Sequence, residues 1–142
     1  MLYDGGCPLC MREVDFLRGR DAGKGNISFV DIDAADYSPA TNAGIDFETA
    51  MGTIHAIRSD GEVLTGVRVF RELYDAVGLG FVYAVTRNPT VERLANKVYD
   101  FWAANRMAVT GRPDLSVILA EKKAASCRVD GACEIPAPAE GK

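Results

Sequence analysis

The sequence predicts an α/β domain with a central mixed β-sheet flanked by helices and a helical extension towards its C-terminal end. An apolar segment at residues 2–3 is followed by a helical pattern from Pro8 and by a β-rich segment at residues 27–33. A strand, a helix and a strand in this order predict a parallel pair with a right-handed crossover. Asp60-Gly61 then joins two further short strands into an antiparallel hairpin, and another helix follows.

The first helix is expected to begin at Pro8, directly after the sequence GGC. Proline suits the first helical position because its missing N–H would have no partner there, which makes Cys7 the expected N-cap residue. Gly19 and the sequence DAGKGN predict the end of this helix. Helical spacing predicts one buried side formed by Leu9, Val14, Phe16 and Leu17.

The remaining elements follow from residue type and spacing. The segment ISFVDID, residues 27–33, is rich in β-branched and aromatic residues and predicts the second strand. One helical turn is expected at DFETA, and MGTIHAIRS and GEVLT predict the hairpin. Helices are predicted at VRVFRELYDAV, at residues 79–86 and at TVERLANKVYDFWAANR. The last helix is expected to bury an apolar stripe of Val91, Leu94, Ala95, Val98, Phe101 and Trp102.

This order of elements is the plan of a thioredoxin-like fold. A chain of 142 residues is long enough for one such domain, which we place at residues 1–112 together with its helical extension. From Pro113 the helical pattern weakens, and we expect residues 113–142 to form a weakly structured tail. In this tail Cys127 and Cys133 could close a small disulfide loop, relay electrons from the first cysteine pair or complete a zinc site. We favour a flexible tail without an essential role.

Composition and charge argue against several classes of function. A net charge of −4 and scattered lysine and arginine residues disfavour binding to nucleic acid. The longest apolar run, from Gly78, is too short to cross a membrane, and no secretory signal pattern is visible. We therefore expect a cytoplasmic protein without nucleic-acid or membrane partners. Because cytosolic thiols are kept reduced, the four cysteines are better explained by chemistry than by structural disulfides.

The clearest functional signal is the sequence LYDGGCPLC at residues 2–10. A thiol attacks a disulfide as its thiolate, and a helix N-terminus stabilises that charge through unpaired N–H groups and the helix dipole. We therefore predict Cys7 as the nucleophile and Cys10, one turn later on the same side, as the resolving thiol. The alternative is that both are small buried apolar residues. It is less favoured because Gly-Gly, the proline and the strand–helix context coincide here.

The sequence YDGGCPLC, followed by REVDFL, resembles the DCC family of thiol–disulfide oxidoreductases. That family is named for an Asp-x-x-Cys-x-x-Cys pattern, which falls here on Asp4, Cys7 and Cys10. Further similarities are FVDIDA, IHAI, GEVLTG and VYDFWAANR, so the resemblance extends from about residue 2 to Arg112. It implies a thioredoxin-like fold and a disulfide reductase or oxidase activity. Arg106 and Arg112 also resemble family positions, for which we expect surface or ion-pairing roles.

Two polar residues are candidates for roles beside the cysteines. Asp4 could accept a proton from Cys10, or its carboxylate could bond N–H groups of the turn at Asp4-Gly5, and the two interpretations are equally favoured. His55, the only histidine, lies in TIHAI, which resembles the TVP stretch that faces the CxxC of glutaredoxins. It would then lie against the cysteines as a hydrogen-bonded core residue, a redox partner or a metal ligand.

Thr65 and Gly66 resemble the turn with which glutaredoxins hold a carboxylate of glutathione, and Arg68 could assist at the N-terminus of the following helix. The simpler interpretation is an N-cap with a turn glycine.

The sequence therefore predicts a protein-disulfide reductase in which Cys7 attacks a protein or small-molecule disulfide and Cys10 resolves it. No bound organic cofactor or metal is expected. A thiol system, with glutathione as one possible reductant, would regenerate the dithiol. The alternative function is a metal-binding or redox-sensing module that uses Cys7, Cys10 and His55.

Overall fold

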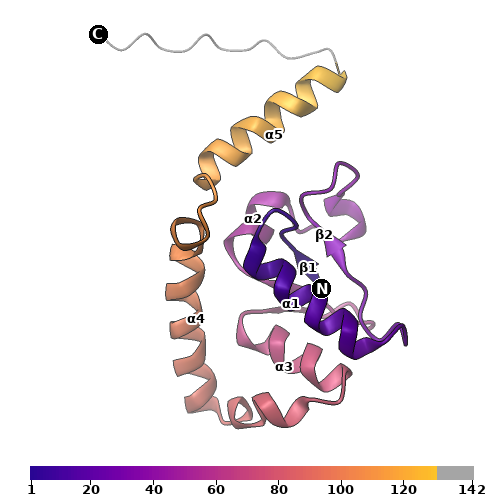
Figure 1. The fold of residues 1–142 in the computed structure, drawn as a ribbon, viewed down its shortest axis with the longest axis vertical. Helices are drawn as coiled ribbons and strands as arrows, with labels where there is room; N and C mark the ends of the chain where they lie inside the picture. The colour runs from indigo at the N-terminus through magenta and orange to yellow at the C-terminus, as the bar shows by residue number, and fades with distance from the viewer. Residues whose placement is uncertain (131–142) are drawn as a thin grey trace. The chain divides into compact units, whose positions relative to one another are not determined.

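The computed structural model describes residues 1–130, and its contacts divide the chain into two units, Met1–Arg112 and Pro113–Lys142. The first unit contains a four-stranded sheet in the order β2-β1-β3-β4 (Figure 1). β1 pairs with β2 in parallel and with β3 antiparallel, and β3 pairs with β4 antiparallel. This order and these directions are those of a thioredoxin-like fold, so the predicted fold class is confirmed. The strands are β1 (Leu2–Tyr3), β2 (Val30–Asp31), β3 (His55–Ile57) and β4 (Val63–Thr65).

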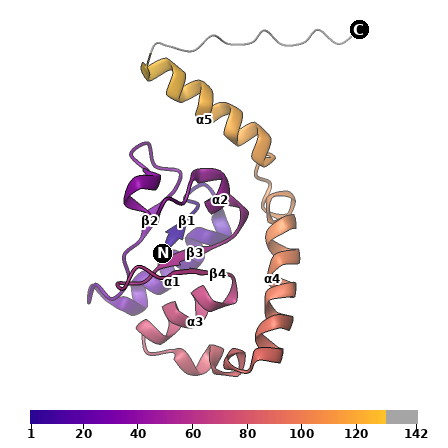
Figure 2. The ribbon, with the colours of Figure 1, turned by 180° about the vertical axis from the view of Figure 1, so that it is seen from behind.

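The helices of the first unit follow the predicted order. They are α1 (Pro8–Asp21), α2 (Phe47–Gly52), α3 (Val67–Ala76) and α4 (Pro89–Thr110), with 3-10 helices η1 (Pro39–Thr41) and η2 (Gly80–Arg87). α1 connects the parallel strands, and in Figure 2 the β3–β4 hairpin lies in front of it. Pro8 occupies the first position of α1, and Cys7 precedes it with extended backbone angles. The helix continues past Gly19 and ends where Ala22 adopts a left-handed conformation.

The core of the first unit lies between the sheet and helices α1 and α3. It includes Val14, Leu17, Ala56, Leu64, Val69 and Leu73. Two residues predicted for the buried side of α1 are instead partly exposed, Leu9 at 36% and Phe16 at 44%. The ring of Phe16 packs beside that of Tyr74 on α3, with 5.9 Å between the ring centroids, at the edge of the core.

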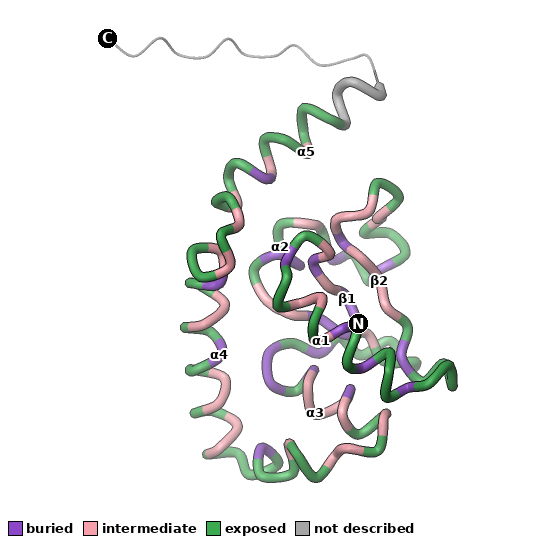
Figure 3. Tube along the Cα trace, in the orientation of Figure 1, coloured by how far each residue is buried: buried purple, intermediate pink, exposed green. Residues whose placement is uncertain are grey.

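The apolar stripe predicted for α4 is not its buried face. Three of its members, Leu94, Val98 and Phe101, are 64%, 63% and 74% exposed. Figure 3 shows α4 as mostly exposed or intermediate along its length.

Polar atoms attach α4 to the rest of the unit instead. The amide oxygen of Asn96 accepts a hydrogen bond from the Val67 N–H at 3.0 Å, and the Tyr99 hydroxyl accepts one from the Ile54 N–H at 2.8 Å. Hydrophobic spacing therefore predicted the helix correctly but not the face that it buries.

The second unit contains α5 (Leu115–Asp130), where we expected a weakly structured tail. The Asp114 carbonyl accepts hydrogen bonds from the N–H groups of Val117 and Ile118, and the following sequence LAEKKAA is rich in strong helix formers. The Cys127 side chain and the whole of Cys133 lie outside the described residues, so the alternatives for this pair stay predictions. Within residues 1–130, no helix combines the length and the hydrophobicity needed to cross a membrane.

Candidate active site

The two cysteines of the CxxC sequence are free thiols at the start of α1. The N–H of Cys7 donates to the Asp4 carbonyl at 3.1 Å, and its carbonyl accepts from the Met11 N–H at 3.0 Å. Cys7 is only 1% exposed, whereas Cys10 is half-buried and lines a pocket. The structure therefore brings the predicted pair together, but it is Cys10 that borders open space.

The electrostatics of the pair distinguish its two sulfurs. Burial raises the pKa of Cys10 to about 12; its hydrogen bond to Cys7 and the negative charges of Cys7 and Asp4 act in the same direction. The guanidinium of Arg106 acts in the opposite direction. Since a hydrogen bond that raises the pKa of a thiol is one that the thiol donates, Cys10 holds its proton and donates it towards Cys7.

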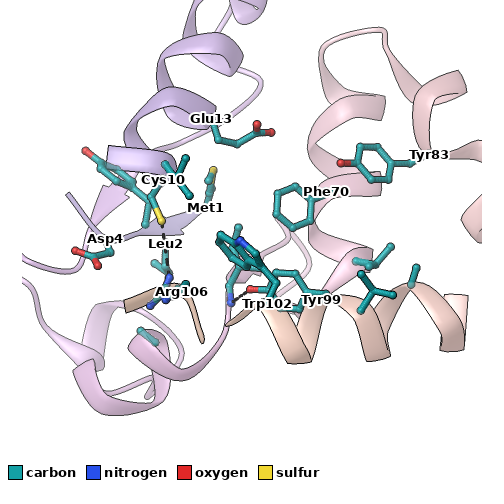
Figure 4. Close-up of a pocket in the computed structure, with 17 residues that line it drawn as sticks. Met1, Leu2, Asp4, Cys10, Glu13, Phe70, Tyr83, Tyr99, Trp102 and Arg106 are labelled. Carbon is teal, nitrogen blue, oxygen red and sulfur yellow. Dashed lines mark hydrogen bonds between the residues drawn. The ribbon is translucent and has the colours of Figure 1, made fainter. Parts of the chain in front are cut away.

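Arg106 on α4 is the residue that sequence reasoning missed, because we expected a surface or ion-pairing role. It is only 6% exposed. Its Nη1 lies 3.8 Å from the Cys10 sulfur (Figure 4), and its Nη2 donates to the Met51 carbonyl at 2.5 Å. Among the ion pairs of the described residues, none joins Arg106 to a carboxylate. A buried cation without a counter-ion is costly, and the adjacent thiol pair is positioned to supply the opposite charge.

The signal that could have identified this residue is its helical spacing. Arg106 follows Tyr99 by seven residues and Trp102 by four, so the three share one face of α4.

Asp4 lies beside the cysteine loop and is 3% exposed. Its Oδ1 accepts hydrogen bonds from the Gly6 N–H at 3.0 Å and from Arg112 at 2.5 Å. Arg112 also pairs with Asp33 at 3.5 Å, and its guanidinium covers Gly6 so closely that a Cβ there would collide with it. These contacts agree with the turn-bonding interpretation of Asp4 and with the ion-pairing role expected of Arg112. Proton transfer by Asp4 stays a prediction.

His55 is a buried residue of β3, paired with Leu2 in the sheet. Its Nδ1 lies 2.9 Å from the Thr53 carbonyl oxygen and donates to it. Burial lowers the pKa of His55, while this hydrogen bond raises it. His55 does not line the pocket beside Cys10, and within residues 1–130 no cluster of three or more His, Cys, Asp or Glu residues is arranged to hold a metal ion. The structure thus places it as a hydrogen-bonded core residue and does not gather the three candidate metal ligands.

The residues of the predicted carboxylate-binding turn have partners within the fold. Gly66 precedes α3 with a positive φ of 60°, and the first N–H of the helix, that of Val67, donates to Asn96. Arg68 pairs with Glu62 at 2.9 Å, and Thr65 is exposed. The two groups that would hold a carboxylate, the Val67 N–H and the Arg68 guanidinium, therefore already have partners within the fold.

The pocket beside Cys10 has a volume of about 490 Å³ and lies between α1 and the segment from α3 to α4 (Figure 4). Asp4, Cys10 and Arg106 lie together in its wall, with Glu13 one turn after Cys10. The remaining wall is apolar and combines aliphatic side chains with aromatic ones, among them Phe70, Tyr83, Tyr99 and Trp102. The site therefore combines a dithiol, a buried cation and an apolar cavity.

Comparisons with known proteins agree with this geometry. The family model for DCC1-like thiol-disulfide oxidoreductase matches residues 1–112, the whole of the first unit. The resemblance to the DCC family is thereby confirmed. The chain is also 55% identical over 123 residues to an uncharacterized chloroplastic protein of Arabidopsis thaliana, a match that covers 87% of the chain and 58% of the relative. The chain thus spans less than two thirds of that relative's length. No solved structure matches the chain.

The name of the Arabidopsis protein contradicts our expectation of a cytoplasmic location. That expectation rests on the lack of a visible secretory or membrane segment. That pattern excludes neither plastids nor other compartments, which is why the inference failed.

Proposed function

The chain belongs to the DCC1-like thiol-disulfide oxidoreductase family, and we propose that it acts as a protein-disulfide reductase through Cys7 and Cys10. The observation that carries the proposal is the thiol pair at the N-terminus of α1, in which Cys10 donates a hydrogen bond to Cys7. A thiolate formed at Cys7 lies at the helix N-terminus, where the helix dipole stabilises negative charge.

The reaction proceeds in two exchanges. The Cys7 thiolate attacks one sulfur of the substrate disulfide, forms a mixed disulfide with it and releases the other sulfur as a thiolate. Cys10 then loses its proton and attacks the Cys7 sulfur, which forms the Cys7–Cys10 disulfide and releases the second substrate thiolate. Two electrons pass from the pair to the substrate. The two product thiols take up one proton from Cys10 and one from solvent.

The first exchange requires the loop before α1 to open, because Cys7 is only 1% exposed. Gly5 and Gly6 give that loop conformational freedom. The contacts of Asp4 and Arg112 with Gly6 hold it closed. Access to Cys7 is therefore coupled to breaking these contacts.

The second exchange needs a thiolate at Cys10, whose pKa is raised. The guanidinium of Arg106, 3.8 Å from the sulfur, stabilises that thiolate as it forms. We therefore assign Arg106 to the resolving step.

The substrates we propose are disulfides of proteins or small molecules, and a thiol system reduces the resulting disulfide without a bound cofactor. Glutathione is one candidate for this reductant. We propose a plastid as the compartment, because the name of the Arabidopsis relative places that protein there.

The test is to equilibrate metal-free protein in a series of glutathione redox buffers, alkylate the free thiols and locate them by mass spectrometry. Cys7 and Cys10 are expected to form a reversible pair. With insulin as the substrate, Cys7→Ser should abolish turnover, whereas Cys10→Ser should accumulate a mixed disulfide at Cys7. The proposal is wrong if both thiols stay reduced throughout the series, or if Cys7→Ser retains full turnover.

A further inference from the structure

The thiol pair is accessible from one side only. Cys7 is almost fully buried, whereas Cys10 is half-buried and lines the pocket. Figure 4 shows Cys10 and Glu13 projecting from α1, with Phe70 and Trp102 on the other side of the pocket. A molecule bound in this pocket therefore meets the pair at Cys10.

We propose that the pocket binds a small apolar dithiol, which reduces the Cys7–Cys10 disulfide by exchange at Cys10. This rests on the proposed function, because reduction of the substrate is what generates that disulfide. Substrate and reductant then use different sulfurs. The substrate reacts at Cys7 after the loop opens, and the reductant reacts at Cys10 from the pocket.

The size and the walls of the pocket favour such a molecule. Its volume of about 490 Å³ lies within the range of about 300–1,000 Å³ that is typical of small-molecule sites. Phe70 packs edge-on against Tyr99 and is stacked with Tyr83, with ring centroids 5.9 and 6.0 Å apart, so these three adjoining rings form one aromatic part of an apolar wall. Glutathione carries two carboxylates and an ammonium group, whose hydration would be lost against these rings. An apolar dithiol has no such cost.

Glu13 indicates that the ligand also carries a hydrogen-bond donor. Its Oε1 is buried and has no hydrogen-bond partner within the described chain, although the carboxyl group also bonds Tyr74. An unpaired buried acceptor is costly, and a ligand with an amide or hydroxyl group would supply the missing donor. The reductant is therefore expected to combine an apolar chain or ring with one such group.

The exchange at Cys10 is chemically balanced. A thiolate of the dithiol attacks the Cys10 sulfur, and Cys7 leaves as the thiolate that the helix N-terminus stabilises, which makes it the better leaving group. The second thiol of the reductant attacks the reductant's own bound sulfur, closes a cyclic disulfide and releases Cys10 beside Arg106. Two electrons pass to the protein. One proton of the dithiol goes to Cys10 and the other to solvent.

The first experiment measures binding without chemistry. Lipoamide, the cyclic disulfide of an apolar dithiol that carries an amide, is titrated into the Cys7→Ser/Cys10→Ser protein. Trp102, the only tryptophan of the chain and part of the pocket wall, reports binding by fluorescence. We expect saturable quenching that weakens about tenfold or more in an Ala95→Phe background, because the added ring fills the pocket. Ala104→Phe, at an exposed position of the same helix, is the matched control and should bind as the parent does.

The second experiment measures reduction of the oxidised wild-type protein by dihydrolipoamide, dithiothreitol and glutathione, with rates expressed per thiolate. Dihydrolipoamide is expected to react about tenfold or more faster than dithiothreitol, and Ala95→Phe to remove that preference. If Ala95→Phe alters the circular-dichroism spectrum, Val98→Phe at the exposed edge of the pocket takes its place.

Equal rates for the two dithiols, or a preference that the pocket substitution leaves unchanged, would overturn the proposal. Insulin reduction by the wild-type protein with dithiothreitol is measured in parallel. If it is retained, only the pocket assignment fails. If it is absent and no Cys7–Cys10 disulfide forms, the proposed function fails with it.

Discussion

The guanidinium of Arg106 lies 3.8 Å from the sulfur of Cys10, although 96 positions separate the two residues in the sequence. The same side chain donates to the Met51 carbonyl at the end of α2. One buried cation thus joins α4, α2 and the cysteine pair. Since α4 presents much of its apolar surface to solvent, this contact gives a functional reason for the position of the helix.

Arg106→Met should slow the resolving step by about tenfold to a hundredfold, the range expected when a hydrogen bond to a charged group worth roughly 1.5–3 kcal/mol is lost. The mixed disulfide at Cys7 should then accumulate, which acid quenching and mass spectrometry would measure. Arg93→Met, at an exposed position of the same helix, is the control. If Arg106→Met protein resolved the mixed disulfide at the wild-type rate, the cation would have no part in this step.

The resolving step, in which Cys10 attacks the mixed disulfide at Cys7, should accelerate as the pH rises. Cys10 reacts as a thiolate, and its pKa is raised above the ordinary value of 9.0. Below the pKa, the thiolate fraction increases about tenfold with each pH unit. In the mixed disulfide Cys7 no longer carries charge, but burial and Asp4 still raise the Cys10 pKa. Stopped-flow measurement of mixed-disulfide decay between pH 6 and 10 is expected to show no plateau below pH 9. A plateau near neutral pH would contradict this assignment.

Gly6→Ala should destabilise the protein, because the added Cβ would collide with the Arg112 guanidinium and displace it from Asp4. Loss of this buried, charge-assisted contact is expected to cost about 1–3 kcal/mol in urea unfolding. Gly19→Ala in α1 is the control, since its Cβ would meet no atom within 4 Å. In an Arg112→Ala background, Gly6→Ala should cost less than it does alone. Purely additive effects would mean that the two residues are not coupled.

The elements that sequence predicted well are those whose signals are local. Pro8 and the preceding Gly-Gly placed the start of α1, and Asp60-Gly61 placed the hairpin turn, because turn and cap chemistry depends on a few adjacent residues. The face that α4 buries could not be derived in this way. Its contacts run through Asn96, Tyr99 and Arg106, and their partners lie at distant positions that spacing alone does not reveal.

The same distinction applies to the site. The CxxC pair and its helix N-terminus were apparent from adjacent residues, whereas Arg106 and the pocket depend on tertiary packing. For His55 the sequence left three roles open, and the structure agrees with that of a hydrogen-bonded core residue. Its ring bonds the carbonyl of Thr53, two positions earlier in the chain. Histidine can serve in redox and metal sites, which made His55 a candidate in the sequence. In the structure it is a buried residue of β3.

His55 should make the protein less stable at mildly acidic pH. Burial lowers its pKa from the ordinary value of 6.5, so the unfolded chain takes up a proton there before the native protein does. The unfolded state then binds more protons, and stability falls as the pH drops below about 6.5. Urea unfolding of the reduced protein at pH 7.5 and 5.5 should show this loss, and His55→Gln should diminish it. The Cys7–Cys10 potential should not change in this variant; a shifted potential would instead support a redox role.

Asp4→Asn separates the two interpretations of Asp4, because they predict opposite changes in the resolving step. As a proton acceptor, Asp4 would be needed to deprotonate Cys10, and its loss would slow resolution by about a hundredfold or more. As a turn residue, it contributes a negative charge that raises the pKa of Cys10. Removing that charge lowers the pKa, increases the thiolate fraction and leaves resolution at pH 7 unchanged or faster.

The contacts of Asp4 favour the second outcome. Its Oδ1 is engaged by the Gly6 N–H and by Arg112, and an asparagine oxygen can still accept from Gly6. Arg112 would lose the nearer of its two carboxylate partners and keep only Asp33, so we expect stability to fall by about 1–3 kcal/mol even where the resolving step is not slowed. Measuring urea unfolding and mixed-disulfide decay on the same preparation separates the two effects. A large loss of rate with unchanged stability would establish Asp4 as the proton acceptor.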